Sequence, residues 1–181
     1  MKSATIVCLL LLALPAVASD SGSKYFAGLT LVDQDGRQVA LYDLMKDRTI
    51  IINTFFSSCT GSCPVMAHSL AAVQEKYADR VGKDLVLVSI TVEPVTDTPR
   101  RLKDYATRVG AKSGWYFLTG STEQVEAALR KLGQYVDTPA AHLNVILVGN
   151  DKTGLWKKLF GRAKSEEIVA SVGSVLDDSG K

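Results

Sequence analysis

The sequence predicts an α/β fold in which a mixed central sheet carries helices on both faces and follows an N-terminal β-hairpin. The apolar runs Ile50–Phe55 and Asp84–Val92 have little polar alternation, which is typical of strands covered on both faces. Helical patterns follow both runs, and such alternation indicates parallel βαβ units. No internal repeat or linker divides the chain, so we expect one domain over residues 25–181.

The first expected elements are a hairpin and a short helical turn. Thr30–Val32 and Gln38–Leu41 flank the segment Asp33–Arg37. That segment contains Asp-Gly, which between two such runs is a hairpin signal. One helical turn is expected over Tyr42–Lys46, immediately before the first buried strand.

Helical periodicity and N-cap residues predict the later helices, and apolar runs predict the later strands. In order, these elements are a helix from Cys63 to about Asp79, a strand over Asp84–Val92, a helix capped by Thr98 and ending at Gly110, a strand over Trp115–Leu118, a helix capped by Ser121 and ending at Gly133, strands over Leu143–Val148 and Leu155–Phe160, and a last helix capped by Ser165. The closing hairpin makes the predicted sheet mixed.

The N-terminus has the pattern of a secretory signal peptide over residues 1–18. Lys2 supplies the positive charge, a short apolar region follows, and Ala16–Ala18 is a small-residue cleavage site. Cleavage would begin the mature chain at Ser19, with a flexible leader over residues 19–24. The apolar region is too short to span a membrane. We therefore expect a periplasmic protein that is soluble, or membrane-associated if the signal is not cleaved.

Charge composition argues against two classes of partner. The chain has 21 basic and 19 acidic residues, a formal net charge of +2. Loss of the signal peptide would reduce this charge by one. A balance so close to zero gives no reason to expect binding to nucleic acid or to an anionic membrane surface. We also expect a monomer.

Two cysteines, Cys59 and Cys63, lie in the stretch Phe55–Pro64, where a buried strand passes into a helix. Unpaired backbone N–H groups and the helix dipole favour negative charge at a helix N-terminus, so thiolates are favoured there. Pro64 suits the first helical turn. The four-residue spacing predicts that both sulfurs lie on one side of that turn, within reach of a disulfide or of one shared metal ion.

The mature chain is expected to hold these two cysteines alone, because Cys8 lies inside the signal peptide. A structural disulfide between Cys59 and Cys63 is one interpretation. It would close a very small loop and stabilise the fold little. A redox-active or metal-binding pair in an oxidising compartment is therefore the favoured alternative.

The two histidines have different surroundings in the sequence. His68 lies five residues after Cys63, about 140° around the helix by the helical repeat, and is expected to be solvated. His142 ends the loop Thr138–His142 before a buried strand. It is a candidate ligand or base, or equally a strand-edge histidine, because the strand order that decides between them does not follow from the sequence.

Two thiolates and one imidazole would suit copper, with Cu(I) held through the thiolates and Cu(II) with the added imidazole. A structural zinc site would need a fourth Cys or His ligand, and His68 is poorly placed to supply it. Met66 has a thioether, but it lies on the apolar stripe of its helix and is expected in the core.

The stretch Phe55–Pro64 resembles the CxxxCP motif of the Sco/SenC copper chaperones. The segments Val88–Pro99 and Trp115–Gly120 are also similar to that family. His142 matches the family's copper-binding histidine in its place before a buried strand. The resemblance extends from about Phe26 to the last helix, which is nearly the whole mature chain.

The resemblance implies a thioredoxin-like fold, with copper held by Cys59, Cys63 and His142. It implies a role in assembling the copper centre of cytochrome c oxidase. Expected partners are the copper-centre subunit of that oxidase and other periplasmic copper carriers or thiol reductants. The chain departs from the family at Glu93 and Ala141, where aspartate is usual; Asp137 lies five residues before His142.

A periplasmic thiol–disulfide oxidoreductase is the alternative function, with Cys59 and Cys63 as a redox-active catalytic pair. Three residues separate the cysteines, whereas general thioredoxin-type enzymes have two. That spacing counts against a general oxidoreductase. The resemblance also implies thiol-reductant activity in some relatives, and the motif does not separate the two activities.

Overall fold

The computed structural model describes residues 21–142, 144–160 and 163–180. The expected signal peptide over residues 1–18 lies outside this range. The elements, in chain order, are α1 (Ser21–Tyr25), β1 (Thr30–Val32), β2 (Gln38–Ala40), α2 (Leu41–Met45), β3 (Thr49–Phe55), α3 (Ser62–Lys76), β4 (Leu85–Thr91), α4 (Pro99–Arg108), β5 (Trp115–Leu118), α5 (Thr122–Lys131), the 3-10 helix η1 (Pro139–Ala141), β6 (Val145–Asn150), β7 (Leu155–Phe160) and α6 (Ser165–Leu176).

The central sheet has five strands in the order β5-β4-β3-β6-β7. Strands β3, β4 and β5 are parallel, with Ile52 opposite Val88 and Val88 opposite Tyr116. Strand β6 runs antiparallel to β3, with Asn53 opposite Ile146, and β7 runs antiparallel to β6. The predicted mixed sheet is therefore confirmed.

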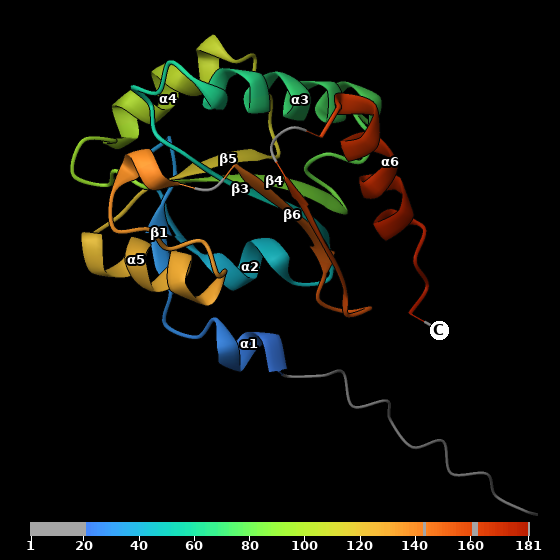
Figure 1. Cartoon of the computed structure of the whole chain (residues 1–181). Coiled ribbons are helices and arrows are strands. Elements are labelled where there is room, and N and C mark those ends of the chain that lie inside the picture. Colours follow the sequence, from blue (N-terminus) through green and yellow to red (C-terminus); the bar gives the residue numbers. More distant parts are fainter. Residues whose placement is uncertain (1–20, 143, 161–162, 181) are drawn as a thin grey trace, which may run out of the picture.

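Two apolar clusters fill the space on either side of the sheet, because successive side chains of a strand point to opposite faces. Ile51 and Phe55 of β3 pack in one cluster with α3, α4 and α6. Ile50 and Ile52 pack in the other with α2, α5 and the β1–β2 hairpin. Figure 1 shows α3, α4 and α6 on one side of the sheet and α1, α2 and α5 on the other.

Local signals in the sequence account for the hairpin and for two helix starts. The Asp33 carboxylate accepts hydrogen bonds from the Asp35 and Arg37 backbone N–H groups, which fixes the turn between β1 and β2. The Thr98 and Ser121 side chains accept backbone hydrogen bonds at the N-termini of α4 and α5. The hairpin and both predicted caps are confirmed.

The start of α6 differs from the prediction that Ser165 caps it. Lys164 occupies the N-cap position without a side-chain cap bond, and Ser165 is the first helical residue. The Ser165 hydroxyl instead donates to the Ser69 hydroxyl at 3.1 Å, a contact between α6 and α3. Strand β6 begins at Val145, while Leu143 lies outside the described residues.

Part of the segment expected to be a flexible leader is helical. Ser21–Tyr25 form α1, and the Tyr25 hydroxyl donates to the Lys131 carbonyl of α5 at 2.9 Å. The next residue, Phe26, is buried in the apolar cluster that includes Leu129 of α5. Apolar burial next to the leader therefore holds its last turn against α5. Among the described residues, no helix is both long and apolar enough to cross a membrane.

Candidate metal centre

Cys59 and Cys63 both lie beyond the carboxyl end of β3, but Cys63 is in a helix and Cys59 is in the turn before it. Helix α3 begins at Ser62, so Cys63 is in its first turn. Cys59 lies before the helix, and its backbone N–H donates to the Phe56 carbonyl at 3.1 Å in a tight turn. Cys59 therefore lies just before the helix rather than within it, but the hydrogen bond between the two thiols shows that the sulfurs are close together, as the spacing predicts.

Both cysteines are free thiols, and their surroundings affect the two sulfurs differently. Burial works to raise the pKa of Cys59, but hydrogen bonds from Cys63 and from the backbone N–H groups of Gly61 and Ser62 outweigh it and lower the pKa. Burial and the neighbouring Cys59 raise the pKa of Cys63 to about 12. Cys59 is therefore the sulfur that ionises first, with the Cys63 S–H donating to it.

His142 reaches the cysteines because β6 runs antiparallel to β3. The start of β6 therefore lies beside the end of β3, where the cysteine loop begins. The His142 Nε2 atom lies 3.6 Å from the Cys63 Sγ atom. The Phe56 ring meets the imidazole edge-to-face, with centroids 5.3 Å apart. The structure thus brings together Cys63 and His142, which are 79 residues apart.

The backbone sets the orientation of this imidazole. His142 Nδ1 lies 2.9 Å from the Pro139 carbonyl oxygen, which can only accept a hydrogen bond. Nδ1 therefore carries the proton and donates, which leaves the lone pair of Nε2 directed toward Cys63. A carbonyl often orients a ligand histidine in this way. Pro139 thus does what a carboxylate beside the histidine would do, although Ala141 stands at that position.

The separation of these donors suits one shared metal ion. Two ligands bound at about 2.3 Å through sulfur and about 2.0 Å through nitrogen lie roughly 3.5 Å apart at a tetrahedral angle. The observed 3.6 Å between Cys63 Sγ and His142 Nε2 matches that separation. Within residues 21–142, 144–160 and 163–180, however, no three His, Cys, Asp or Glu side chains form a closed metal-binding group. Cys59, which is hydrogen-bonded to Cys63, is the third donor available to this pair.

Other residues surround the thiols. Tyr105 of α4 is buried, and its pKa is raised by that burial and by the negative charges of Cys63 and Cys59. The Arg108 guanidinium lies 5.2 Å above the Tyr105 ring. The Ser58 hydroxyl donates to the Glu93 carboxylate at 3.4 Å, so Glu93 contacts the cysteine loop. Neither Tyr105 nor Arg108 stands out in the sequence as a site residue, since both lie on an ordinary amphipathic helix.

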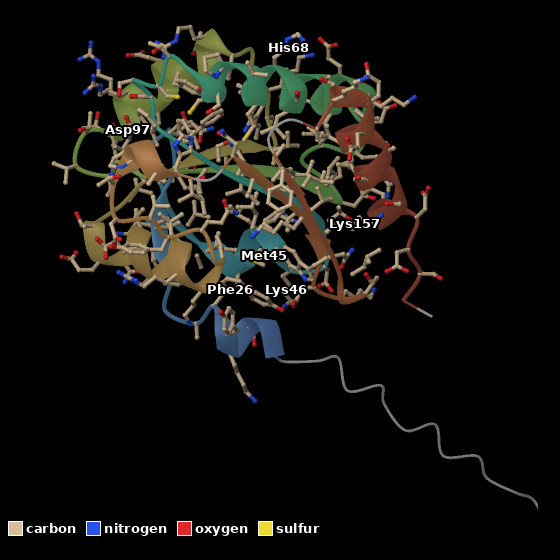
Figure 2. The ribbon with its side chains drawn as sticks, viewed as in Figure 1. Phe26, Met45, Lys46, His68, Asp97 and Lys157 are labelled. Carbon is tan, nitrogen blue, oxygen red and sulfur yellow. The ribbon has the colours of Figure 1, made fainter. Side chains whose placement is uncertain are left out.

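The remaining sequence candidates lie outside this cluster. His68 is exposed, and Figure 2 shows it on the outer side of α3. Met66 is buried, and its sulfur accepts a hydrogen bond from the Asn53 amide at 3.3 Å, as expected of a core residue. Asp137 is exposed in the loop before η1. None of the three therefore joins the two thiols and the imidazole.

Fold and site together define a class of protein. A mixed sheet with helices on both faces, and a two-cysteine loop between a central strand and its helix, are the features of a thioredoxin-like protein. The third donor, His142, distinguishes it from a protein whose site consists of two thiols alone. The class is thus a thioredoxin-like protein with a thiol–imidazole site.

The chain belongs to the SCO1/SenC family, whose sequence profile matches residues 18–176. It is 32% identical over 132 residues to the SCO1 protein homolog of Bacillus subtilis strain 168, a match that covers 67% of each chain. It is 30% identical over 105 residues to a protein of Stutzerimonas stutzeri named for copper binding, covering 58% of this chain and only 50% of that protein.

Solved structures share the fold. The copper-bound ScoI structure of Arabidopsis thaliana is 22% identical, has a TM-score of 0.68, and aligns over 82% of this chain and 95% of that one. BsSco is described as having a disulfide switch and as a member of the Sco family of cytochrome c oxidase assembly proteins. It is 26% identical, has a TM-score of 0.67, and aligns over 81% of this chain and 90% of its own. These likenesses confirm the thioredoxin-like fold.

Proposed function

We propose that the protein is an exported copper-binding factor that delivers copper to, or maintains the thiols of, the copper centre of cytochrome c oxidase. One observation carries the proposal: the His142 Nε2 atom lies 3.6 Å from the Cys63 Sγ atom, the separation expected of two ligands on one metal ion. The donors match the preferences of copper, since thiolates favour Cu(I) and imidazole favours Cu(II). Family membership, and relatives described as binding copper or assembling the oxidase, support the same function.

In this proposal copper is cargo held by the thiolates of Cys59 and Cys63 and by His142 Nε2. Metal binding requires both sulfurs to lose their protons. Cys59 is already disposed to do so, whereas Cys63 loses its proton as the metal replaces it. The Pro139 carbonyl keeps the imidazole in the tautomer that offers Nε2. Partners would be the copper-centre subunit of the oxidase, together with periplasmic copper carriers and thiol reductants.

Metal reconstitution of paired histidine variants tests this function. Reduced protein is titrated with Cu(I) and with Cu(II), and bound metal and affinity are measured. His142→Ala should weaken Cu(II) binding by more than about a hundredfold, because a direct ligand matters at least as much as the groups that orient it. His68→Ala is the matched control and should bind like the unaltered protein. If His142→Ala binds both ions as tightly as the unaltered protein, the three-donor site is wrong.

A thiol–disulfide oxidoreductase is the second candidate, favoured by the opposite pKa shifts of the two cysteines. The Cys59 thiolate would attack a client disulfide, forming a mixed disulfide and releasing one client thiolate. Cys63 would then lose its proton and attack the Cys59 sulfur, releasing the second client thiol and leaving a Cys59–Cys63 disulfide. A periplasmic thiol reductant must return that disulfide to two thiols. Copper-free protein that shows no exchange with a disulfide substrate would remove this candidate.

Export is part of the proposal and has its own test. The charged, apolar and small-residue pattern over residues 1–18 supports secretion. Cell fractionation should place the protein in the periplasm, and sequencing of its N-terminus should find Ser19. Recovery in the cytoplasm with residues 1–18 intact would contradict this location.

A further inference from the structure

We propose that Asp97 is a positioning residue for the thiol–imidazole site: it holds the turn that carries Cys59 and so determines where the Cys59 sulfur lies relative to Cys63. Asp97 acts on the cysteines through Ser57, to which its carboxylate is hydrogen-bonded. The inference rests on the proposed function, because the site it positions is the proposed copper site.

Asp97 lies in the loop between β4 and α4 and is completely buried. Its Oδ2 atom accepts hydrogen bonds from the Ser57 backbone N–H at 3.0 Å and from the Thr91 hydroxyl at 2.5 Å. Its Oδ1 atom accepts a hydrogen bond from the Ser57 hydroxyl. Figure 2 shows Asp97 at the end of the molecule where α4 begins. One carboxyl group therefore joins the end of β4 to the loop after β3.

Ser57 is a central residue of the turn that leads to Cys59. The turn runs from Phe56 to Cys59 and is closed by the Cys59 N–H donating to the Phe56 carbonyl. Both polar donors of Ser57 bind Asp97, and its carbonyl accepts from Arg108 at 3.5 Å. Since Cys59 lies outside α3, this anchored turn supplies the restraint on Cys59 that the helix gives to Cys63.

A second buried aspartate shows what an ordinary structural role looks like in this fold. The Asp33 carboxylate is 1% exposed and accepts bonds from Asp35 and Arg37, all within its own hairpin turn. Asp97 instead reaches a residue 40 positions away, two residues before Cys59. Burying a carboxyl group is costly unless its hydrogen bonds are satisfied. At Asp97 that cost is offset in part by hydrogen bonds from Ser57 in the turn before Cys59, which points to a role in placing Cys59.

Substitution by asparagine separates positioning from charge. In Asp97→Asn the amide oxygen can take the place of Oδ2 and accept from Ser57 and Thr91. The amide NH2 can take the place of Oδ1 and donate to the Ser57 hydroxyl oxygen, which is both a donor and an acceptor. Asp97→Asn therefore keeps the anchor without the charge, whereas Asp97→Ala removes the anchor.

The experiment measures Cu(II) affinity, the Cu(II)–thiolate absorption spectrum and the reduction equilibrium of the Cys59–Cys63 disulfide in the folded protein. Asp97→Ala should weaken Cu(II) binding about tenfold to a hundredfold, as loss of an orienting group does, and should shift the absorption band. Asp97→Asn should stay within about threefold of the unaltered protein on the same scale. Asp33→Ala is the matched control: it should destabilise folding but leave both the affinity and the spectrum unchanged.

Three results would overturn the inference. Asp97→Ala could bind copper with unchanged affinity and spectrum, Asp33→Ala could weaken binding as much as Asp97→Ala, or Asp97→Asn could lose as much as Asp97→Ala. If Asp97→Ala does not fold, Ser57→Ala replaces it; it removes one of the two bonds to Asp97 and should give an intermediate loss. No loss would then overturn the inference.

Failure of the proposed function would be distinguishable from failure of this inference. If the unaltered protein binds no copper, the copper function is wrong, but the disulfide equilibrium still reports on Cys59. Asp97→Ala should then change that equilibrium constant about tenfold, while Asp97→Asn and Asp33→Ala leave it unchanged. An unchanged constant in Asp97→Ala would reject the positioning role as well.

Discussion

Cys59 and Cys63 are four residues apart, yet the pKa of Cys59 is lowered while that of Cys63 is raised to about 12. Cys63 is buried in the apolar cluster between α3, α4 and the sheet, whereas Cys59 is half-buried. A thiolate on Cys59 is stabilised by the S–H of Cys63 and by backbone N–H groups, and it in turn holds the proton on Cys63. The two thiols therefore differ in reactivity: Cys59 is the nucleophilic sulfur, and Cys63 keeps its proton.

This asymmetry predicts the order in which the thiols react. Alkylation needs the thiolate, whose fraction grows as the pH rises through the pKa. In reduced, metal-free protein, iodoacetamide should therefore modify Cys59 first at pH values near 8. Cys63 should react more slowly, because burial and the neighbouring Cys59 raise its pKa. Mass spectrometry of peptides from early time points measures the two initial rates.

Once Cys59 is alkylated, it no longer raises the Cys63 pKa. The variant Cys59→Ser is therefore the control, because it shows how fast Cys63 reacts without the Cys59 thiol beside it. Burial is the first cause of that raised pKa and persists in the variant. Cys63 should therefore remain slow there. Equal initial rates for the two thiols at pH 8 would contradict the assignment of Cys59 as the nucleophile.

The pairing of β6 with β3 is the structural element that brings His142 to the cysteines. Apolar runs and caps in the sequence predict the buried strands, the hairpin and the starts of α4 and α5, because these depend on neighbouring residues. Strand order depends on packing between distant segments, so the sequence left the role of His142 open. The anchor from Asp97 to Ser57 spans 40 residues and was missed for the same reason. The only local sign of this anchor in the sequence is the position of Asp97 directly before Thr98 and Pro99, where α4 begins.

Two glycines at the amino end of the sheet predict a large difference in stability. Gly114 has a φ of +91°, and a Cβ there would lie 2.4 Å from the Gly82 backbone nitrogen. Gly82 has a φ of +84°, but its Cβ would meet nothing closer than 3.6 Å. Gly114→Ala therefore combines backbone strain with a backbone clash, whereas Gly82→Ala has the strain alone.

We expect Gly114→Ala to lower the free energy of unfolding by roughly 2–4 kcal/mol. The matched variant Gly82→Ala should lower it by about 1 kcal/mol. Urea denaturation of the reduced, metal-free protein measures both. Equal losses in the two variants would show that the two loops can separate here without cost, contrary to the packing between β4 and β5.

At the scale of the whole molecule, the site is assembled from three separate segments. The cysteine loop follows β3, the Asp97 anchor follows β4, and His142 precedes β6. All three segments meet at the same end of the sheet, because β3 and β4 run parallel and both end there, whereas β6 runs antiparallel and begins there. The fold therefore determines the donor set, although each segment is ordinary by itself.

The central claim is that copper is held by the sulfurs of Cys59 and Cys63 together with His142. A disulfide between the cysteines removes both thiolates at once and leaves one imidazole, which should hold copper weakly. The two thiols are close enough for a hydrogen bond, so oxidation should form this bridge readily. Copper bound to the dithiol should in turn block alkylation of both cysteines.

Copper affinity of one sample before and after controlled oxidation, with the disulfide confirmed by mass, tests this claim most directly. The thiol–imidazole site predicts high affinity in the reduced protein, its loss on oxidation and its return after a thiol reductant is added. Equal affinity in the two states would show that the copper lies elsewhere and would contradict the assignment of Cys59, Cys63 and His142 as its ligands.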